Sequence, residues 1–377
     1  MSTILLLAVA LAFSPVYGEA DAFFCLYAEV ETVAGTGSHG YHDGVPGQFN
    51  LPMGIFSIGD DLFIADTYNN LLRVVDPYGR VSRVTGRIID MDELNFPRGL
   101  YRDGYIENAL FNRPMDAVVD GRGWIFIADS RNNAIRVIAE DYVFSFAGGE
   151  GYGHANGPVS EALFHRPSAI AIGPCGNFFV ADTFNHAIRM IDTYGYVTTV
   201  AGVPGYFGHE DGASDAAVFN SPMGIAVSPD GTIFVADTGN HLIRVIEDGY
   251  VRTLAGTLLF PGDIEWEYEY SDFDDLPLGG SGLMFNMPVG LSLWGDILIV
   301  ADSANHMIRG VMPCGEVFTL AGTGSPGHID GVRLESAFHL PQGVYVRGDT
   351  LYIADTGNNV IRVISLAVVG GIEYEEA

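Results

Sequence analysis

Apolar residues in this chain gather in short runs that turn residues separate, and one such arrangement recurs along most of its length. Between residues 222 and 237, two β-branched and aromatic runs flank Pro229-Asp230-Gly231, which predicts a β-hairpin. A second turn at 238–241 leads into an apolar run at 242–246, and Asp248-Gly249 returns the chain through residues 250–255. We therefore expect four antiparallel strands, whose nearly continuous apolar character is typical of a sheet covered on both faces.

Six copies of this unit share one register. Each has an Ala-Asp pair, a polar turn and an apolar strand with Arg seven residues after the Asp. Successive aspartates lie 53 to 65 residues apart, which is long enough for one four-stranded blade. The aspartates are Asp66, Asp129, Asp182, Asp237, Asp302 and Asp355, and the arginines are Arg73, Arg136, Arg189, Arg244, Arg309 and Arg362.

The sixth copy ends without an outer strand of its own. Residues 29–35 before the first copy match residues 197–202 in the third, and we expect them to supply the missing strand. The pairing would join the two ends of the chain and protect exposed strand edges. The predicted fold is therefore all-β, a six-bladed β-propeller in which the N-terminal strand completes the last blade.

The repeats resemble those of the NHL-repeat family. Asn240-His241-Leu242 spells the motif, and the longer family pattern recurs in residues 321–324, 330–331, 337–343 and 354–362. The resemblance covers residues 28–365 and implies a six-bladed propeller. The family includes extracellular sensor domains, RNA-binding regulators and a zinc-dependent peptide-amidating lyase, so membership alone does not choose a function.

The repeated Asp and Arg are interpreted as structural. Asp66 ends a predicted strand beside a turn, where short polar side chains bond to nearby backbone amides. Arg73 sits among apolar neighbours and needs an acidic or carbonyl partner, for which Asp66 or its equivalents are candidates. A residue that recurs once per blade is more simply a requirement of the repeat than a unique site.

Two long connections, 85–112 and 257–286, break the register. Both join the outer strand of one blade to the inner strand of the next, so we expect them on the face that carries the Asp-x-x-Asn turns. The first surrounds Phe96-Pro97 with charged residues, namely Arg87, Asp90, Asp92, Glu93, Arg98 and Arg102. The second interleaves acids with aromatics and supplies the predicted binding residues Glu265, Trp266, Glu267, Tyr268, Glu269, Tyr270, Asp272, Phe273, Asp274 and Asp275.

Metal binding is left open by the sequence. Eight of the ten histidines fall at three shared repeat positions, and only His39 and His42 lie out of register. The resemblance to the amidating lyase keeps zinc as a candidate, but none of that enzyme's local motifs is matched here. The acidic connection could hold calcium through carboxylate oxygens. No cofactor is predicted.

The ends of the chain and its cysteines suggest export. An apolar run at 4–13 is typical of a secretory signal, so the expected organisation is a signal peptide over 1–22, a propeller over 23–370 and an acidic tail over 371–377. No later run is long enough to span a membrane. Of the three cysteines, we predict a bridge between Cys25 and Cys314 that would fasten the closing strand.

The net charge of the chain limits the classes of partner that it can bind. The formal net charge is -29, with 47 acids against 18 bases, and such a chain repels nucleic acid. All the basic residues are Arg, so lysine chemistry is excluded. We predict a secreted, non-enzymatic binding module for a protein, glycan or basic ligand. The alternatives are a metal-dependent lyase or hydrolase with its site at the channel mouth, and a subunit of an extracellular assembly.

Overall fold

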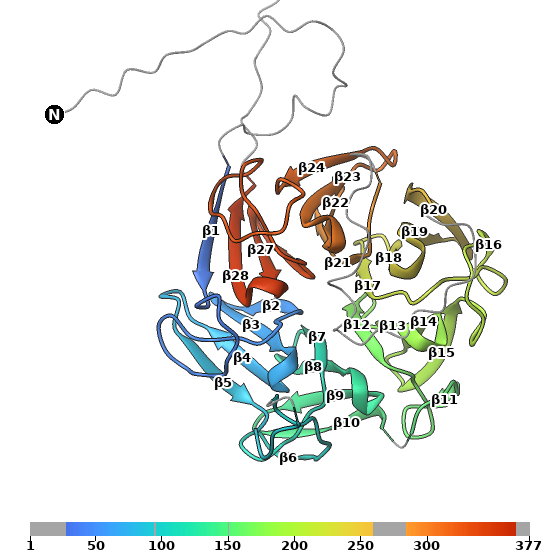
Figure 1. Ribbon diagram of the computed structural model, residues 1–377. Helices are drawn as coiled ribbons and strands as arrows, with labels where there is room; N and C mark the ends of the chain where they lie inside the picture. Colours follow the sequence, from blue (N-terminus) through green and yellow to red (C-terminus); the bar gives the residue numbers. More distant parts are fainter. Residues whose placement is uncertain (1–27, 94–95, 150, 259–283, 367–377) are drawn as a thin grey trace, which may run out of the picture.

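Six twisted sheets stand around a central axis in the computed structural model, which describes residues 28–93, 96–149, 151–258 and 284–366 (Figure 1). Each sheet is a blade of antiparallel strands, and the chain completes one blade before it enters the next. The predicted six-bladed all-β propeller is confirmed.

In the first five blades, the four main strands follow the order of the sequence from the axis outward. The blades comprise, from first to fifth, β2 (Ile55–Ile58), β3 (Asp61–Asp66), β4 (Leu71–Val75) and β5 (Val81–Thr85); β7 (Pro114–Val119), β8 (Ile125–Asp129), β9 (Ala134–Ala139) and β10 (Tyr142–Gly148); β12 (Pro167–Ile172), β13 (Phe178–Asp182), β14 (Ala187–Ile191) and β15 (Tyr196–Ala201); β17 (Gly224–Val227), β18 (Ile233–Asp237), β19 (Leu242–Glu247) and β20 (Tyr250–Gly256); and β21 (Pro288–Trp294), β22 (Ile297–Asp302), β23 (Met307–Val311) and β24 (Val317–Ala321).

The sixth blade closes the ring with strands from both ends of the chain. It holds β26 (Gly343–Arg347), β27 (Thr350–Asp355) and β28 (Val360–Ser365), and its outer strand is β1 (Glu29–Ala34). Antiparallel pairing of β1 with β28 aligns Val30 with Ile364 and Thr32 with Arg362. The predicted closure by the N-terminal strand is therefore confirmed, and Figure 1 shows blue β1 beside red β28.

Short elements repeat at two further places. Two-residue strands add a fifth member to four blades: β6 (Gly104–Tyr105), β11 (Gly157–Pro158), β16 (Gly212–Ala213) and β25 (Gly331–Val332). A 3-10 turn links the second and third strands of every blade, at Thr67–Asn69, Ser130–Asn132, Thr183–Asn185, Thr238–Asn240, Ser303–Asn305 and Thr356–Asn358. We call the face that carries these turns the turn face.

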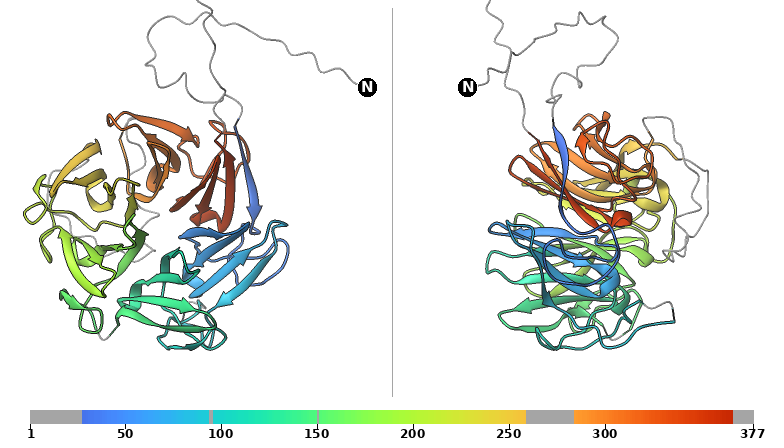
Figure 2. Two further views of the ribbon diagram at one scale, coloured as in Figure 1. Left: turned by 180° about the vertical axis from the view of Figure 1, so that it is seen from behind. Right: turned by 60° about the vertical axis from the view of Figure 1, so that its left-hand side comes forward.

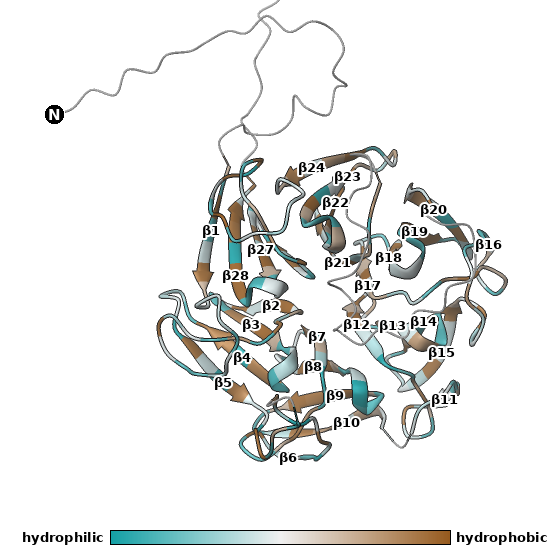
Figure 3. Ribbon diagram, viewed as in Figure 1, coloured by the Kyte–Doolittle hydropathy of each residue, from teal (hydrophilic) through white to brown (hydrophobic). Residues whose placement is uncertain are grey.

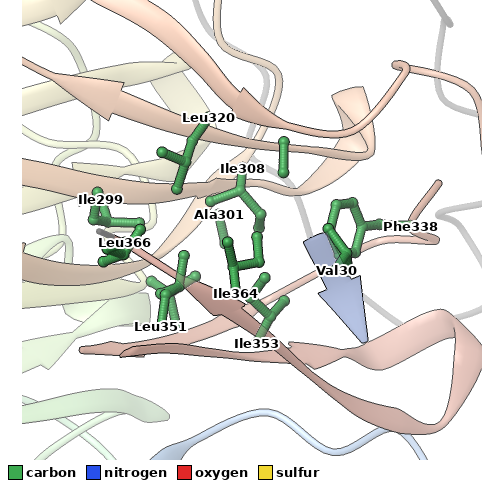
Figure 4. Packing of buried hydrophobic residues seen from close by; sticks show 12 residues of the cluster. Val30, Ile299, Ala301, Ile308, Leu320, Phe338, Leu351, Ile353, Ile364 and Leu366 are labelled. Carbon is green, nitrogen blue, oxygen red and sulfur yellow. The ribbon is translucent and has the colours of Figure 1, made fainter. Parts of the chain in front are cut away.

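The hydrophobic core lies between the blades. Hydrophobic strands face one another across each interface, while the connections are more polar (Figure 3). Between blades five and six, Ile299 and Leu320 pack against Leu351 and Ile364, with Phe338 filling the outer side (Figure 4). Since both faces of every blade are covered in this way, the strands need apolar residues at nearly every position, as the sequence has.

A side chain from each 3-10 turn latches its blade to the next. The residue that follows the turn accepts a hydrogen bond from a backbone N–H just before the next inner strand. It is an asparagine in three blades (Asn70, Asn133 and Asn359, with N···O distances of 2.8–2.9 Å) and a histidine in the others. The Nδ1 atoms of His186, His241 and His306 accept at 3.0–3.1 Å from Ser221, Met287 and Leu340.

These three histidine latches make stability depend on pH. Burial lowers the pKa of His186, His241 and His306 to about 4, helped by His165 beside the first and His339 beside the third. Because the folded pKa lies below the unfolded value, the stabilisation is complete above about pH 6.5 and is lost as the pH falls toward 4. The expected loss is at most about 3 kcal/mol per histidine.

A triple His→Asn variant at 186, 241 and 306 tests this expectation, because asparagine already serves as the latch in three other blades. Urea unfolding between pH 7.5 and 4 should show wild-type stability falling more steeply than that of the variant. The buried aspartates are the same in both proteins, so the difference between the profiles reports the histidines. Parallel profiles would contradict the assignment.

The first long connection lies on the turn face, as predicted. Asn70 donates a hydrogen bond to the Pro97 carbonyl at 2.7 Å, and Asn132 donates to the Leu100 carbonyl at 3.0 Å. Its later part is ordinary blade structure, because β6 pairs with β10. Figure 2 shows the ring from behind and from the side, so that its two faces can be told apart. The second connection is described only at 257–258 and 284–286, so its predicted place is untested.

Candidate functional site

The repeated aspartates and arginines form one buried network per blade. In the first, Asp66 Oδ1 accepts the backbone N–H of Asn50 at 2.8 Å. Its Oδ2 accepts from Asn69 Nδ2 at 2.7 Å and from Arg73 Nη1 at 2.8 Å. The guanidinium also donates Nη2 to Asp43 Oδ1 at 2.7 Å. The Asn69 amide and both Nη atoms of Arg73 bond to groups of the same blade or the segment leading into it, so the network holds the turn to the strands.

Four other blades repeat this geometry closely. Arg136, Arg189, Arg244 and Arg362 each donate Nη1 to the aspartate seven residues earlier at 2.7–2.8 Å. In the fifth blade, Arg309 Nε lies 3.9 Å from Asp302 Oδ2 instead. Burial raises the pKa of Asp66 to about 6, against the charge of Arg73, and raises that of Asp302 to about 7, where Arg309 compensates less closely.

A different constellation occupies the centre of the turn face. A pocket with an empty volume of about 620 Å³, part of it open to solvent, lies where the first four blades meet the axis. We call it the channel mouth. Its lining residues are Met53, Thr67, Tyr68, Arg113, Met115, Ser130, Arg131, Arg166, Ser168, Thr183, Phe184 and Met223.

Two of the mouth arginines lie over aromatic rings. The Arg113 guanidinium carbon is 3.0 Å from the centre of the Tyr68 ring, and that of Arg166 is 4.5 Å from the Phe184 ring. Each ring also contacts a second aromatic group: Phe96 meets Tyr68 edge-on, and His165 lies at a tilt against Phe184. Stacking on a ring fixes a guanidinium plane, so its N–H edges are presented in a defined direction.

The mouth breaks the symmetry of the repeat. Arg113 and Arg166 precede the inner-strand proline in blades two and three, where the other blades have Leu51, Ser221, Met287 and Leu340. The second residue of the 3-10 turn is Tyr68, Arg131 and Phe184 in blades one to three, but Gly239, Ala304 and Gly357 in the others. Large cationic and aromatic side chains are thus confined to one half of the mouth. A scaffold requirement would recur in every blade, so this half is the candidate site.

Below the mouth, the inner strands line a narrow channel, whose empty volume of about 440 Å³ includes space open to solvent. Asp116 on β7 faces it and takes the position that is Gly54, Gly224, Gly290 and Gly343 in four other blades. Burial raises the pKa of Asp116 to about 6, although two backbone amides lower it. The residue is half-buried and lines the narrow channel.

None of the mouth residues was among the predicted binding residues. Searching for insertions overlooks them, because they occupy ordinary repeat positions. An alignment of the six copies at the two positions named above would have found them, since three copies differ there in size and charge. The predicted binding residues from Glu265 to Asp275 all lie outside the described residues. Their role stays a prediction.

The metal and disulfide predictions are not settled by the described residues. Within 28–93, 96–149, 151–258 and 284–366, no group of three or more His, Cys, Asp or Glu is placed to hold a metal ion. Cys314 is exposed in the turn between β23 and β24, and Cys25 lies outside these ranges. A search of the same ranges finds no helix with the length and hydropathy of a membrane span.

Comparison with known proteins identifies the repeat. The family model for the NHL repeat matches residues 219–246, which take in β17, β18 and most of β19. Protein SUPPRESSOR OF QUENCHING 1, chloroplastic, of Arabidopsis thaliana is 28% identical over 278 residues, which is 71% of this chain and 26% of that protein. NHL repeat-containing protein 2 of Gallus gallus is 32% identical over 175 residues, 42% of this chain and 23% of that protein. The chain thus spans about a quarter of these relatives.

Comparison with solved structures shows that other proteins share this fold. An auxiliary nutrient binding protein from Bacteroides ovatus superposes with a TM-score of 0.63 at 17% identity, covering 90% of this chain and 77% of that one. Identity at this level shows the fold alone. The repeat model, the sequence relatives and the six blades built on one pattern agree: the chain contains an NHL repeat, is similar to NHL repeat-containing proteins and forms a six-bladed propeller.

Proposed function

We propose that this protein is a non-enzymatic binding module whose ligand occupies the channel mouth and carries a negative charge. The observation that carries the proposal is the gathering of Arg113, Arg131 and Arg166 at one pocket of a chain whose net charge is -29. Guanidinium groups bind carboxylate and phosphate through paired N–H donors. Here Tyr68 and Phe184 add apolar contact area beside those donors.

The surroundings of the mouth favour selective binding. Most of the surface of so acidic a chain repels anions, so a local cluster of positive charge distinguishes this pocket. The three arginines are half-buried, and charge-assisted hydrogen bonds are stronger in such a shielded place than in open water. The size of the pocket suits a small molecule or a chain end rather than a folded partner.

Export is part of the proposal, and it rests on the signal-like pattern of residues 1–22. Binding of a protein, glycan or basic ligand by residues 265–275 is a separate prediction for the same face. The lyase or hydrolase alternative would require a metal, which elemental analysis of the purified protein can detect.

Fluorescence titration with 1-anilinonaphthalene-8-sulfonate, an aromatic anion, tests the mouth. The variant Arg113→Gln/Arg166→Gln should bind the dye at least tenfold more weakly, because each lost charge-assisted contact is worth about 1.5–3 kcal/mol. The matched control is Arg122→Gln, in the turn between β7 and β8 on the opposite face, where the side chain is 61% exposed. This control should bind as the wild type does.

Competition separates charge from hydrophobicity. Benzoate should displace the dye from the wild type, whereas uncharged benzamide of the same shape should not. If the double variant keeps wild-type affinity and benzamide competes as well as benzoate, the mouth is not an anion site and the proposal fails.

A further inference from the structure

The channel beneath the mouth carries a negative charge that the repeat does not need. Building on the proposed function, we infer that the ligand is amphoteric. Its anionic group lies at the mouth arginines, an aliphatic spacer passes inward, and a protonated amine reaches Asp116. The chemical class is a linear ω-amino acid or a molecule with the same pattern of charges.

Asp116 differs in chemistry from the residues at the same repeat position in the other blades. Four blades have glycine at this position and the remaining one has Ala169, so only the second blade places a carboxylate there. The glycines are explained by close approach of neighbouring inner strands. A Cβ added at Gly343 would lie 1.8 Å from the Met53 carbonyl oxygen, and one at Gly224 would lie 1.8 Å from that of Val289. The interface between blades two and three instead admits a charged side chain, because Asp116 reaches the backbone of Ile170 there.

The carboxylate of Asp116 is held in place but its charge is not balanced. Its Oδ1 accepts the N–H of Ala117 at 2.9 Å, and its Oδ2 accepts the N–H of Ile170 at 3.0 Å. No arginine or histidine of the described ranges lies within ion-pair distance of it. A shielded, unbalanced carboxylate attracts a cation, and each oxygen still has a lone pair for a further donor.

The mouth and the channel are continuous, because Met53, Met115, Ser168 and Met223 line both. Three of these four shared residues are methionines, so the passage between the mouth and the channel is mainly apolar and suits an aliphatic spacer better than a polar one. Arg113 and Asp116 are three residues apart on one chain segment, so their backbones are at most about 10 Å apart. An amine and an acid on the same carbon are too close together to reach both groups.

Calorimetric titration of the whole protein with 8-aminooctanoate and octanoate at pH 7.5 tests the inference. The two probes share the acid and spacer and differ at the end that should meet Asp116. We expect 8-aminooctanoate to bind at least tenfold more tightly than octanoate, and 4-aminobutyrate, which is too short, to gain no such advantage. The variant Asp116→Asn keeps one side-chain oxygen, which can accept one of the two backbone N–H groups, but loses the charge, so it should bind both eight-carbon probes equally.

The outcomes separate the inference from the proposed function. If octanoate and 8-aminooctanoate bind the wild type equally, the amine site is overturned while the anion site stands. If neither binds the wild type and the aromatic anion also fails, both proposals are overturned. The comparison of ligands on the wild type needs no variant, so it holds even if Asp116→Asn is poorly folded. A purely structural Asp116 would alter melting temperature and leave the preference between ligands unchanged.

Discussion

Deleting residues 1–35 is expected to abolish cooperative folding of the propeller. The deletion removes β1, which pairs with β28 on one side and with β25 on the other. Val30 within it is fully buried and packs in the cluster between blades five and six. Without β1 the edge of β28 is exposed and the ring loses the strand that joins its two ends, which leaves a template for aggregation.

The matched control is deletion of residues 1–27, which keeps β1 whole. Thermal unfolding followed by circular dichroism, with size-exclusion chromatography for aggregation, should show a wild-type transition for the control and a lost or strongly broadened one for the longer deletion. Equal melting temperatures for the two truncations would show that the closing strand is dispensable.

Replacing Arg244 by Met is expected to cost about 3–5 kcal/mol, because it strands a buried carboxylate without its cation. Asp237 and Arg244 are both inaccessible to solvent, and the Nη1–Oδ2 distance is 2.7 Å. The methionine keeps much of the apolar stem that packs near Phe219, so the change falls mainly on charge and hydrogen bonds. Urea unfolding at pH 7.5 measures the loss.

Two comparisons make this measurement specific. Adding Asp237→Asn to Arg244→Met removes the unbalanced charge and should recover part of the stability, which a double-mutant cycle reports. Arg122→Met breaks the pair of the exposed Arg122 side chain with Asp120, whose distance is also 2.7 Å, and should cost less than about 1 kcal/mol. Equal losses for the buried and the exposed arginine would contradict the structural reading of the repeat.

Much of the fold can be predicted from the sequence because the same local signals for a four-stranded blade recur in every repeat. The hairpin turn at 229–231, the continuous apolar strands and the Asp-to-Arg spacing each encode blade geometry locally. Closure by β1 was also predictable, since the strand missing after β28 has a match before the first copy. The six 3-10 turns were expected only as turns, and their latching role depends on contacts between different blades.

The candidate site was far less predictable. Tyr68, Arg113, Phe184 and Arg166 are neighbours because consecutive blades rotate about one axis and bring equivalent positions to the same pocket. In the sequence, Tyr68 and Phe184 are more than a hundred residues apart and neither stands in an unusual motif. The two long connections, 85–112 and 257–286, differ in length from those of the other repeats, but the length of a connection does not indicate which side chains meet at the axis.

The sequence alone determined the number of blades, the order of their strands and the residues that tie each turn to its sheet, because those interactions act within one repeat or between consecutive ones. Only the tertiary structure decided where charge accumulates. Ring closure superimposes side chains from distant repeats at the mouth and leaves Asp116 facing the channel, and no local pattern reports a meeting of that kind.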